Sequence, residues 1–414
     1  MKLQYFLTNI LNGRISAGYN ERELKLHLSE ITTDNAQATK TKLSQLRLIS
    51  FLTIDLYNAT EFQIQCFFDG IKNNQHVTSL AIRYNNSDVE FIEFITGPLL
   101  APGRAQIQLI ATQLKENTFL KTLHLSTIPM WDESTADILF SFLRDNKSLE
   151  SLNVHDVIDE NVIKAVFKAV KQRESSTNLS FKDWKGFKMV FTSEMIDSLA
   201  IADGINTSLR GLHFDNVKMS EEQIIKLTSV LEKYKNIDNL SMVHSCMTDK
   251  LLGHLINYIK TNNTLKKIDI HSNPLGNAGL KLLGDELRTN TSLSSINLSD
   301  TGLSAIENLE EGWNYLLICL QTNTTLKQII IGLDHEGLAV QTFECWSQIE
   351  TLLADNVSGR PHAQMLFADV DSDYDAENDN SYNSHTGPGT FFHTGKKRIN
   401  APTFNDINKL CKME

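Results

Sequence analysis

The chain has 414 residues, 41% of them hydrophobic and 21% charged, which is typical of a water-soluble globular protein. Its formal net charge of -11 at pH 7 argues against nucleic-acid recognition through phosphate contacts and against binding to an anionic membrane surface. No apolar run reaches the roughly 18 residues that a membrane-spanning helix needs, so we expect no membrane span.

The cysteines are odd in number and include no CxxC pair, so they do not define a disulfide framework. We therefore expect reduced thiols and a cytoplasmic protein, since thiols stay reduced in that compartment. The five cysteines are Cys66, Cys246, Cys319, Cys345 and Cys411.

The N-terminal region, residues 1–40, is irregular and is expected to cap the rest of the chain. Alternation of leucines with charged residues predicts a strand over Leu24–Leu28. A second strand is expected at Leu46–Leu48, led by Leu43. A capping-box pattern at Asn58–Glu61 then predicts a helix through Phe68.

The next predicted unit, which opens with strand Leu80–Ile82 led by Val77, is unusually long. It runs for 43 residues, from Val77 to Leu120. The excess lies around Thr96–Gly103, where two prolines and two glycines predict a loop. Such a loop either carries function or is a tolerated surface insertion.

The second half of the chain is a regular repeat of 28 residues. Its first position is occupied in turn by Leu209, Ile237, Leu265 and Leu293. Within each repeat, alternating apolar residues predict a short strand, and spacings of three and four residues then predict an amphipathic helix. The further strands are expected at Leu123–Leu125, Leu152–Val154, Leu179–Phe181, Leu212–Phe214, Leu240–Met242, Ile268–Ile270, Ile296–Leu298 and Ile329–Ile331.

The strand LKKIDIHSN at Leu265–Asn273 and the helix that follows it resemble the leucine-rich repeat family, in the ribonuclease-inhibitor-like class. This resemblance implies an α/β solenoid shaped like a horseshoe, with parallel strands on the concave face and helices on the convex face. Position 9 of the family repeat is often asparagine, and only Asn85 and Asn273 match it here.

The domain organisation follows from this assignment. About ten repeats are expected over residues 41–336, and a capping helix is expected over 337–357. The remaining residues, 358–414, are polar and acidic and are expected to be largely disordered.

The candidate binding site is the concave face, because proteins of this family usually bind partners there. Histidine and aspartate recur beside the strand positions of neighbouring repeats, which lie roughly 5 Å apart. These residues predict a polar face that titrates between pH 5 and 8, although any solvated strand face is polar. The partner-binding candidates are His124, His155, Asp156, Asp183, His213, Asp215, His244, Asp269, His271 and Asp300.

No pattern in the sequence points to catalysis or to a cofactor. There is no P-loop, GxSxG or dinucleotide fingerprint, so we expect no enzyme activity. Histidine and aspartate on adjacent strands could converge on a metal, but no metal-ligand spacing supports this, and we expect none. The aspartates from Asp369 to Asp375 lack the glycine of a calcium loop, since Tyr374 stands there.

The expected function is that of a non-enzymatic, monomeric scaffold that binds a partner protein on its concave face. The Asn-, Lys- and Ile-rich composition also resembles that of the leucine-rich-repeat effectors that intracellular bacteria deliver into the host cytosol. The alternative is a GTPase activator or enzyme inhibitor of the Ran GTPase activator or ribonuclease inhibitor type.

Overall fold

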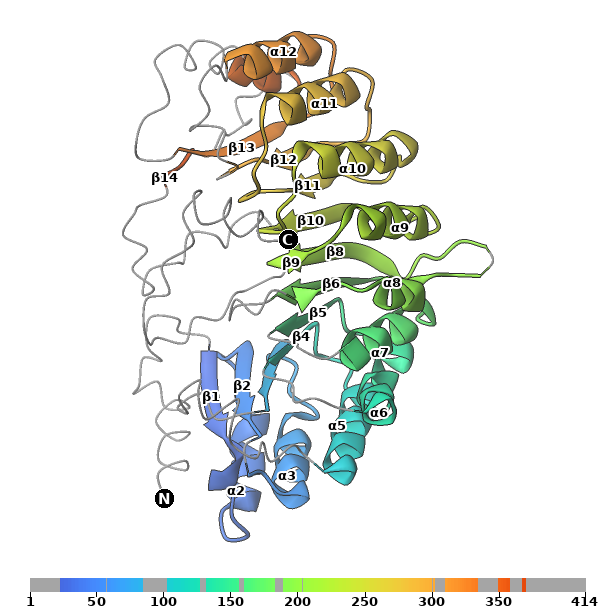
Figure 1. Cartoon of the computed structure of the whole chain (residues 1–414). Coiled ribbons are helices and arrows are strands. Elements are labelled where there is room, and N and C mark those ends of the chain that lie inside the picture. The colour runs from blue at the N-terminus through green and yellow to red at the C-terminus, as the bar shows by residue number, and fades with distance from the viewer. Residues whose placement is uncertain are drawn as a thin grey trace. The chain divides into compact units, whose positions relative to one another are not determined.

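A computed structural model describes residues 23–56, 58–84, 103–126, 132–155, 160–182, 189–202, 204–299, 301, 310–333, 349–357 and 367–369 (Figure 1). The chain divides into two compact units. Unit 1 comprises Met1–Phe187 and Asp197–Leu199, and unit 2 comprises Lys188–Ile196 and Ala200–Glu414.

Unit 1 is built on six parallel strands that follow one another in chain order in the described residues. The strands are β1 (Glu23–His27), β2 (Phe51–Asp55), β3 (Ser79–Arg83), β4 (Thr122–Ser126), β5 (Ser151–His155) and β6 (Thr177–Lys182). The helices are the short η1 (Leu28–Glu30), then α2 (Ala36–Ser44), α3 (Glu61–Ile71), α5 (Arg104–Glu116), α6 (Glu133–Asp145) and α7 (Glu160–Lys171).

Unit 2 has the same alternation of strand and helix, at a more constant spacing along the chain. Its parallel sheet contains β8 (Leu209–Asp215), β10 (Asn239–Val243), β11 (Lys267–Asp269), β12 (Ser295–Asn297), β13 (Gln328–Leu333) and β14 (Phe367–Asp369). A small pair is formed by β7 (Met189–Val190) and β9 (Val217–Lys218). The helices are α9 (Glu221–Leu231), α10 (Asp249–Thr261), α11 (Asn277–Leu287) and α12 (Glu310–Leu320), while the residues of α8 (Ser193–Leu199) are shared between the two units.

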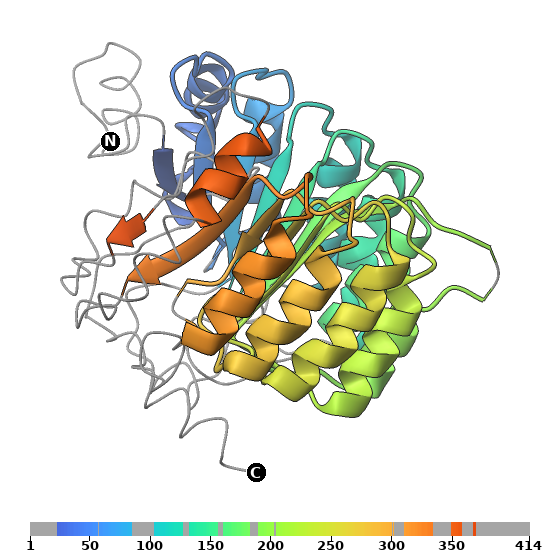
Figure 2. The same cartoon turned by 90° about the horizontal axis from the view of Figure 1, so that it is seen from above.

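The expected α/β leucine-rich-repeat solenoid is confirmed. Figure 2 shows α9 to α12 side by side along one face of the strands of unit 2. Strand apolar residues stack in register across the sheet: Leu212 is the partner of Leu240, which in turn is the partner of Ile268. The expected helix positions are buried as well, including Leu227, Leu255, Leu283 and Leu316. Burial of these apolar side chains is the main driving force for stacking the repeats.

One predicted strand is wrong. The sequence predicted a strand at Leu46–Leu48, but the structure places Leu43 at the end of helix α2 and forms strand β2 at Phe51–Asp55 instead. Leu48 is 72% exposed. The strand lies later because Leu52 and Ile54, both completely buried, pair in register with Leu80 and Ile82.

Helix starts follow the capping rules. Helix α3, the first after β2, begins two residues later than expected, because its N-cap is Thr60 and not Asn58. Thr60 and Gln63 form the capping box. Ser220, which forms a capping box with Gln223, is the N-cap of α9, and Thr248 is the N-cap of α10. Each cap oxygen accepts a backbone N–H that would otherwise lack a partner at the helix start.

A recurring asparagine ties several helix-to-strand turns to the preceding repeat. In unit 2, Asn323 donates from Nδ2 to the carbonyls of Leu287 (2.6 Å) and Asn290 (3.1 Å). Its Oδ1 accepts the backbone N–H groups of Thr325 (3.0 Å) and Leu326 (2.8 Å). Asn74 and Asn146 make the same four kinds of bond in unit 1.

The hydroxyl two residues after the asparagine completes this turn. Thr325 donates to the carbonyl of Asn290, and Ser292 donates to the carbonyl of Asn262. The Asn-x-Ser/Thr patterns at Asn290 and Asn323 are therefore explained by internal bonding, and both asparagines are buried. In one repeat of unit 1 the position is taken by Arg173, which donates to the carbonyls of Leu143 and Leu149.

The asparagine at position 9 of the family repeat has the expected role where the structure describes it. Asn273 donates to the carbonyls of Met242 and Ile270, and its oxygen accepts the N–H groups of Ser245 and Met247.

Several sequence expectations fall outside the described residues. They are the first 22 residues of the expected N-terminal cap, residues 96–102 of the predicted loop, Asn85 and most of the tail. Within residues 337–357, residues 349–355 are helical, and Asn356 bonds the carbonyls of Asn323 and Leu326. Within 358–414 the structure describes only β14, which pairs with β13. The predicted domain boundaries stay a prediction.

The core position on the most regular helix gives a direct test of the stack. Leu283→Ala should lower the free energy of unfolding by about 2–5 kcal/mol, because Leu283 is only 1% exposed and truncation leaves a cavity. Chemical denaturation of the purified chain measures this. Leu282→Ala, at the half-buried neighbouring leucine, should cost clearly less. Equal effects would contradict the assigned helix face.

The turn asparagine gives a second test. Asn323→Ala should lower the free energy of unfolding by about 1–3 kcal/mol, because it leaves buried carbonyl and N–H groups without partners. Asn236→Ala is the matched control, since exposed Asn236 makes a single described side-chain bond, to the carbonyl of Thr207. If the two replacements proved equally mild, the turn asparagines would not hold the repeats together.

Candidate functional site

The candidates of unit 2 lie together at the ends of three neighbouring strands. His213 of β8 is in register with Ser241 of β10, and Ser241 with Asp269 of β11. Asp215 ends β8, His244 directly follows β10, and His271 lies two residues after the end of β11. The repeat therefore brings five of the ten predicted residues onto one strand face.

The best-defined pair is His271 with Asp269. The Nδ1 atom of His271 lies 2.7 Å from Oδ1 of Asp269, and the same oxygen accepts the backbone N–H of His271 at 3.2 Å. Both side chains are 26% exposed. Burial acts to raise the pKa of Asp269, but the charge and hydrogen bonds of His271 and a hydrogen bond from Asn297 hold that pKa below its usual range. Asp269 is therefore ionised at neutral pH.

A second pair lies one repeat away. Nδ1 of His244 is 3.2 Å from Oδ1 of Asp215, with side-chain exposures of 32% and 17%. The rings of His244 and His271 meet edge to face with centroids 5.8 Å apart. The two pairs thus form one cluster, called here the His–Asp cluster: Asp215, His244, Asp269 and His271.

The backbone holds His244 in place through an unusual turn. Asn216, His244 and Ser272 occupy equivalent positions of three repeats and have left-handed φ angles of 60°, 49° and 54°. In this conformation their N–H groups donate to the carbonyls of Val243, His271 and Ser299 in the next repeat. This turn fixes where the side chain of His244 leaves the strand face.

His213 lies beside the cluster in a less polar setting. Burial lowers the pKa of His213, and the nearby carboxylates of Asp269 and Asp238 oppose that shift in part. Asp238 is itself paired with Arg210 at 2.9 Å. His213 is therefore the candidate of unit 2 that is least suited to carry a charge.

The histidines at the equivalent strand positions of unit 1 are more deeply buried than those of unit 2. His124 and His155 lie on neighbouring strands with ring centroids 5.9 Å apart, and Phe51 contacts the other side of His124. Their exposed fractions are only 2% and 7%. Burial, together with the neighbouring His155, holds the pKa of His124 well below its ordinary value. The solvated face expected here is instead an enclosed one.

Sequence reasoning missed two charged residues on this face of unit 1. Asp55 and Arg83 are partners on the adjacent strands β2 and β3, and both are buried. Asp55 also lies 3.8 Å from His27. The shifted assignment at Leu46–Leu48 hid Asp55, although a constant spacing from Leu80 would have found it. The remaining candidates, Asp156, Asp183 and Asp300, lie outside the described residues.

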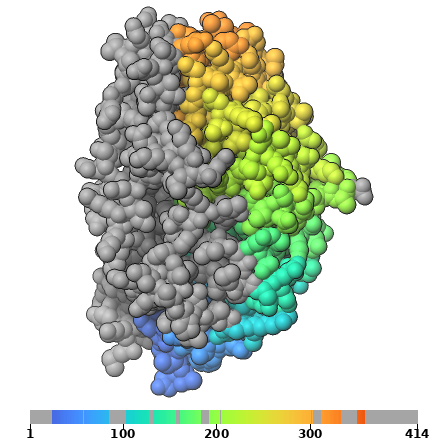
Figure 3. Space-filling model, in the orientation of Figure 1, coloured from blue at the N-terminus to red at the C-terminus, as the bar shows by residue number. Residues whose placement is uncertain are grey.

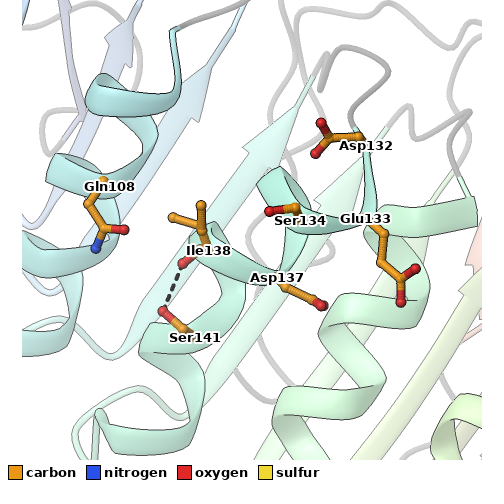
Figure 4. Close-up of a pocket in the computed structure, with 7 residues that line it drawn as sticks. All are labelled: Gln108, Asp132, Glu133, Ser134, Asp137, Ile138 and Ser141. Atoms are coloured by element: carbon orange, nitrogen blue, oxygen red, sulfur yellow. Dashed lines mark hydrogen bonds between the residues drawn. The ribbon is translucent and has the colours of Figure 1, made fainter.

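A hollow of about 760 Å³ lies on the helix side of unit 1. Figure 4 shows its lining residues on α5 and α6, with Ser141 donating to the carbonyl of Ile138. Its acidic residues are engaged elsewhere: Lys168 pairs with Glu133 and lies 3.7 Å from Asp137. The hollow is lined by Gln108, Asp132, Glu133, Ser134, Asp137, Ile138 and Ser141.

In the part of the chain that the structure describes, no three His, Cys, Asp or Glu side chains group in a way that could hold a metal ion. None of the helices described there is both long and apolar enough to cross a membrane. Cys66 and Cys319 are free thiols, as expected, whereas Cys246 is disulfide-bonded, which corrects the expectation that all thiols are reduced.

Comparison with known proteins finds low similarity to leucine-rich repeat proteins. No protein-family profile matches the sequence. A mouse protein, NACHT, LRR and PYD domains-containing protein 14, is 24% identical over 309 residues, which cover 73% of this chain and 28% of the mouse protein. The chain thus spans little more than a quarter of that relative. The 28-residue pattern and the strand–helix architecture are those of a leucine-rich-repeat solenoid, and this similarity agrees with that fold.

Two solved structures are similar at low identity. The leucine-rich repeat-containing protein LegL7 from Legionella pneumophila is 13% identical, with a TM-score of 0.48, and the match covers 79% of this chain and 98% of that one. The yeast Rad7 and Elc1 complex matches with 15% identity and a TM-score of 0.43 over 82% of this chain and 85% of the other.

The buried histidine of unit 1 predicts a dependence of stability on pH. An imidazole with a depressed folded-state pKa binds a proton more readily in the unfolded state, so stability falls as pH drops below about 6.5. We expect the unfolding midpoint to fall between pH 7 and pH 5, and His124→Gln to reduce that fall. His76→Gln, at an exposed histidine of unit 1, is the control. An unchanged pH profile in His124→Gln would contradict this assignment.

Proposed function

We propose that this protein is a non-enzymatic scaffold that binds a partner protein on the strand face of unit 2. The observation that carries the proposal is the His–Asp cluster with His213. These side chains come from three successive repeats, stay partly exposed, and are held in place by hydrogen bonds to one another. A surface that is ordered before binding loses less conformational entropy on association than a flexible one.

The strand face offers recognition chemistry of several kinds. It combines ionised carboxylates, imidazoles and the amide of Asn297 with the hydroxyls of neighbouring serines. Polar side chains arranged in this way favour specificity and association rate over raw affinity. The remaining predicted residues, His124, His155, Asp156, Asp183 and Asp300, belong to this proposal as extensions of the same strand position.

The proposal extends to the compartment in which the protein meets its partner. The Asn-, Lys- and Ile-rich composition supports a bacterial effector that acts in the cytosol of a host cell. Translocation of the tagged full chain into cultured host cells by a bacterium with an active secretion system tests this. A chain that stays in the bacterium would overturn the effector assignment and leave the scaffold proposal intact.

The alternative is a GTPase activator or enzyme inhibitor. A GTPase activator supplies a charged or amide side chain to the nucleotide site of its partner. Stimulation of GTP hydrolysis by a captured GTPase would favour this alternative over a passive scaffold.

Charge reversal at the His–Asp cluster tests the binding face. Asp215→Lys with Asp269→Lys should weaken binding of a captured and purified partner by tenfold or more, about 1.4 kcal/mol, because it replaces two carboxylates at the centre of the surface. Binding of the purified partner by calorimetry measures this. Thermal melting checks folding, since these carboxylates are less exposed than sequence reasoning expected.

The control is an equal charge change on the helix side, whose continuous surface in unit 2 is visible in Figure 3. Glu222 and Glu232 of the α9 region are both exposed, whereas Glu221 pairs with Lys250 and His254 and is less suitable. Glu222→Lys with Glu232→Lys should leave binding unchanged. A larger loss from the helix pair than from the strand pair would move the binding surface to the helices.

A further inference from the structure

Cys246 forms a disulfide bond, and the other cysteines of the chain restrict which residue is its partner. Of the five cysteines, Cys66 and Cys319 are free thiols, and both are buried. The partner of Cys246 within the chain is therefore Cys345 or Cys411. Both of these lie outside the described residues, but the length of the chain ties each of them to an element that the structure describes.

Cys246 itself is held in place by hydrogen bonds of its neighbours. It lies three residues after β10 and is half-buried, so its sulfur can bond a second segment of the chain. The side-chain oxygen of Asn273 accepts the N–H groups of Ser245 (3.0 Å) and Met247 (2.9 Å), which flank the cysteine. Its φ angle of 55° is left-handed, a conformation that a cysteine keeps only where its surroundings impose it.

The helical residues 349–355 show where Cys345 lies along the stack. Cys345 is four residues before Ile349, which is fully buried in this helix. Asn356 follows the helix and donates to the carbonyls of Asn323 and Leu326, in the way that Asn323 donates to carbonyls of the repeat before it. The helix therefore belongs to the repeat that follows α12.

The spacing of the helices excludes Cys345 as the partner. Three steps, from α10 through α11 and α12 to residues 349–355, separate this helix from the one that follows Cys246 (Figure 2). Helices packed side by side are about 8–10 Å apart, so these steps cover about 24–30 Å. Four extended residues and the Cα separation of a disulfide together span only about 21 Å.

Cys411 can reach the same position. It lies 42 residues after Asp369, the last residue of β14. In the sheet of unit 2, β11, β12 and β13 separate β14 from β10, so these two strands are about 19 Å apart. A flexible chain of this length spans about 35 Å on average, which is more than the distance to be bridged. The reach of the chain therefore favours Cys411.

We propose that Cys411 is the disulfide partner of Cys246, and that this bond is a redox-controlled link that holds the segment around Cys411 beside the His–Asp cluster. His244 of that cluster lies two residues before Cys246, so the linked segment restricts access to its ring. Reduction of the bond releases the segment and opens this part of the strand face to a partner. The role in partner access rests on the proposed function, whereas the pairing of the cysteines does not.

Oxidised glutathione, a small-molecule disulfide, is the oxidant for this bond. The thiolate of one cysteine attacks a sulfur of oxidised glutathione, the glutathione disulfide breaks, and one glutathione leaves. The thiolate of the other cysteine then attacks the mixed disulfide, which forms the bond between Cys246 and Cys411 and releases the second glutathione. The two protons and two electrons that the cysteines lose are gained by the two molecules of reduced glutathione, and an excess of reduced glutathione reverses the reaction.

Peptide mapping of the full chain tests the pairing. The protein is equilibrated with oxidised glutathione, treated with N-ethylmaleimide, and digested with trypsin from the monomer band of a non-reducing gel. Mass spectrometry should find residues 236–250, which carry Cys246, joined to residues 410–412, which carry Cys411. Cys345→Ser should keep this link, and Cys411→Ser should abolish it.

Three results would overturn the pairing. The first is a link from residues 236–250 to residues 328–396, the tryptic peptide that carries Cys345. The second is N-ethylmaleimide on Cys246 of the wild-type chain. The third is a link that occurs only in a covalent dimer.

The position of the linked segment is tested with diethyl pyrocarbonate, which modifies accessible imidazole rings. Mass spectrometry follows the rate at His244, with the exposed His76 of unit 1 as the reference. His244 should react at least threefold faster in Cys411→Ser than in the oxidised wild-type chain, and at the wild-type rate in Cys345→Ser. His76 should react equally in all three proteins. Equal rates at His244 in the wild-type chain and Cys411→Ser would show that the segment does not lie beside the cluster.

The two proposals fail in different ways. If the captured partner binds the Asp215→Lys, Asp269→Lys variant as well as it binds the wild-type chain, the strand face is not the partner surface, whatever the disulfide does. If that variant loses the partner while peptide mapping joins Cys246 to a residue other than Cys411, the scaffold proposal stands and the redox-controlled link is wrong.

Discussion

The turn asparagine between helix and strand constrains how neighbouring repeats join, while burial of apolar side chains drives their stacking. A carboxamide carries both donors and acceptors, so one side chain can satisfy carbonyls of the preceding repeat and N–H groups of its own turn. Asn146 and Asn323 each do both while buried. Arg173 takes the place of this asparagine in one repeat but replaces only its donors, because a guanidinium group cannot accept a hydrogen bond. It reaches the carbonyls of Leu143 and Leu149, and its remaining described bond goes to the carbonyl of Ser175.

This ladder also explains how far the fold could be predicted. Apolar spacing was sufficient for the regular repeats, because Leu212, Leu240 and Ile268 recur at a constant interval and must face one core. It failed at Leu46–Leu48, where two overlapping patterns of leucine and isoleucine compete. Only the interval to the next strand separates them, since Leu52 lies 28 residues before Leu80. The spacing of apolar residues within one repeat identifies its strand and its helix. The constant interval between successive repeats is needed to decide which residues form the strand.

The sequence predicted which residues of the candidate site lie together, but it did not predict their hydrogen bonds or their burial. Repeat spacing correctly brought His213, Asp215, His244, Asp269 and His271 together on unit 2. It could not reveal that Asp269 and His271 bond each other, because that contact depends on side-chain rotation and on the left-handed turn that follows the strand. Nor could it reveal the burial of His124 and His155, since a polar residue in a strand pattern is usually assigned to solvent.

Histidines at comparable strand positions therefore lie in different environments in the two units. In unit 1, His124 packs between Phe51 and His155, where burial disfavours its charged form. In unit 2, each cluster histidine instead lies beside a carboxylate and stays partly exposed. A histidine of the first kind contributes to stability only while it stays neutral. The partly exposed side chains of the cluster can contact a partner without unfolding of the strand, which is the reason for proposing the binding surface on unit 2.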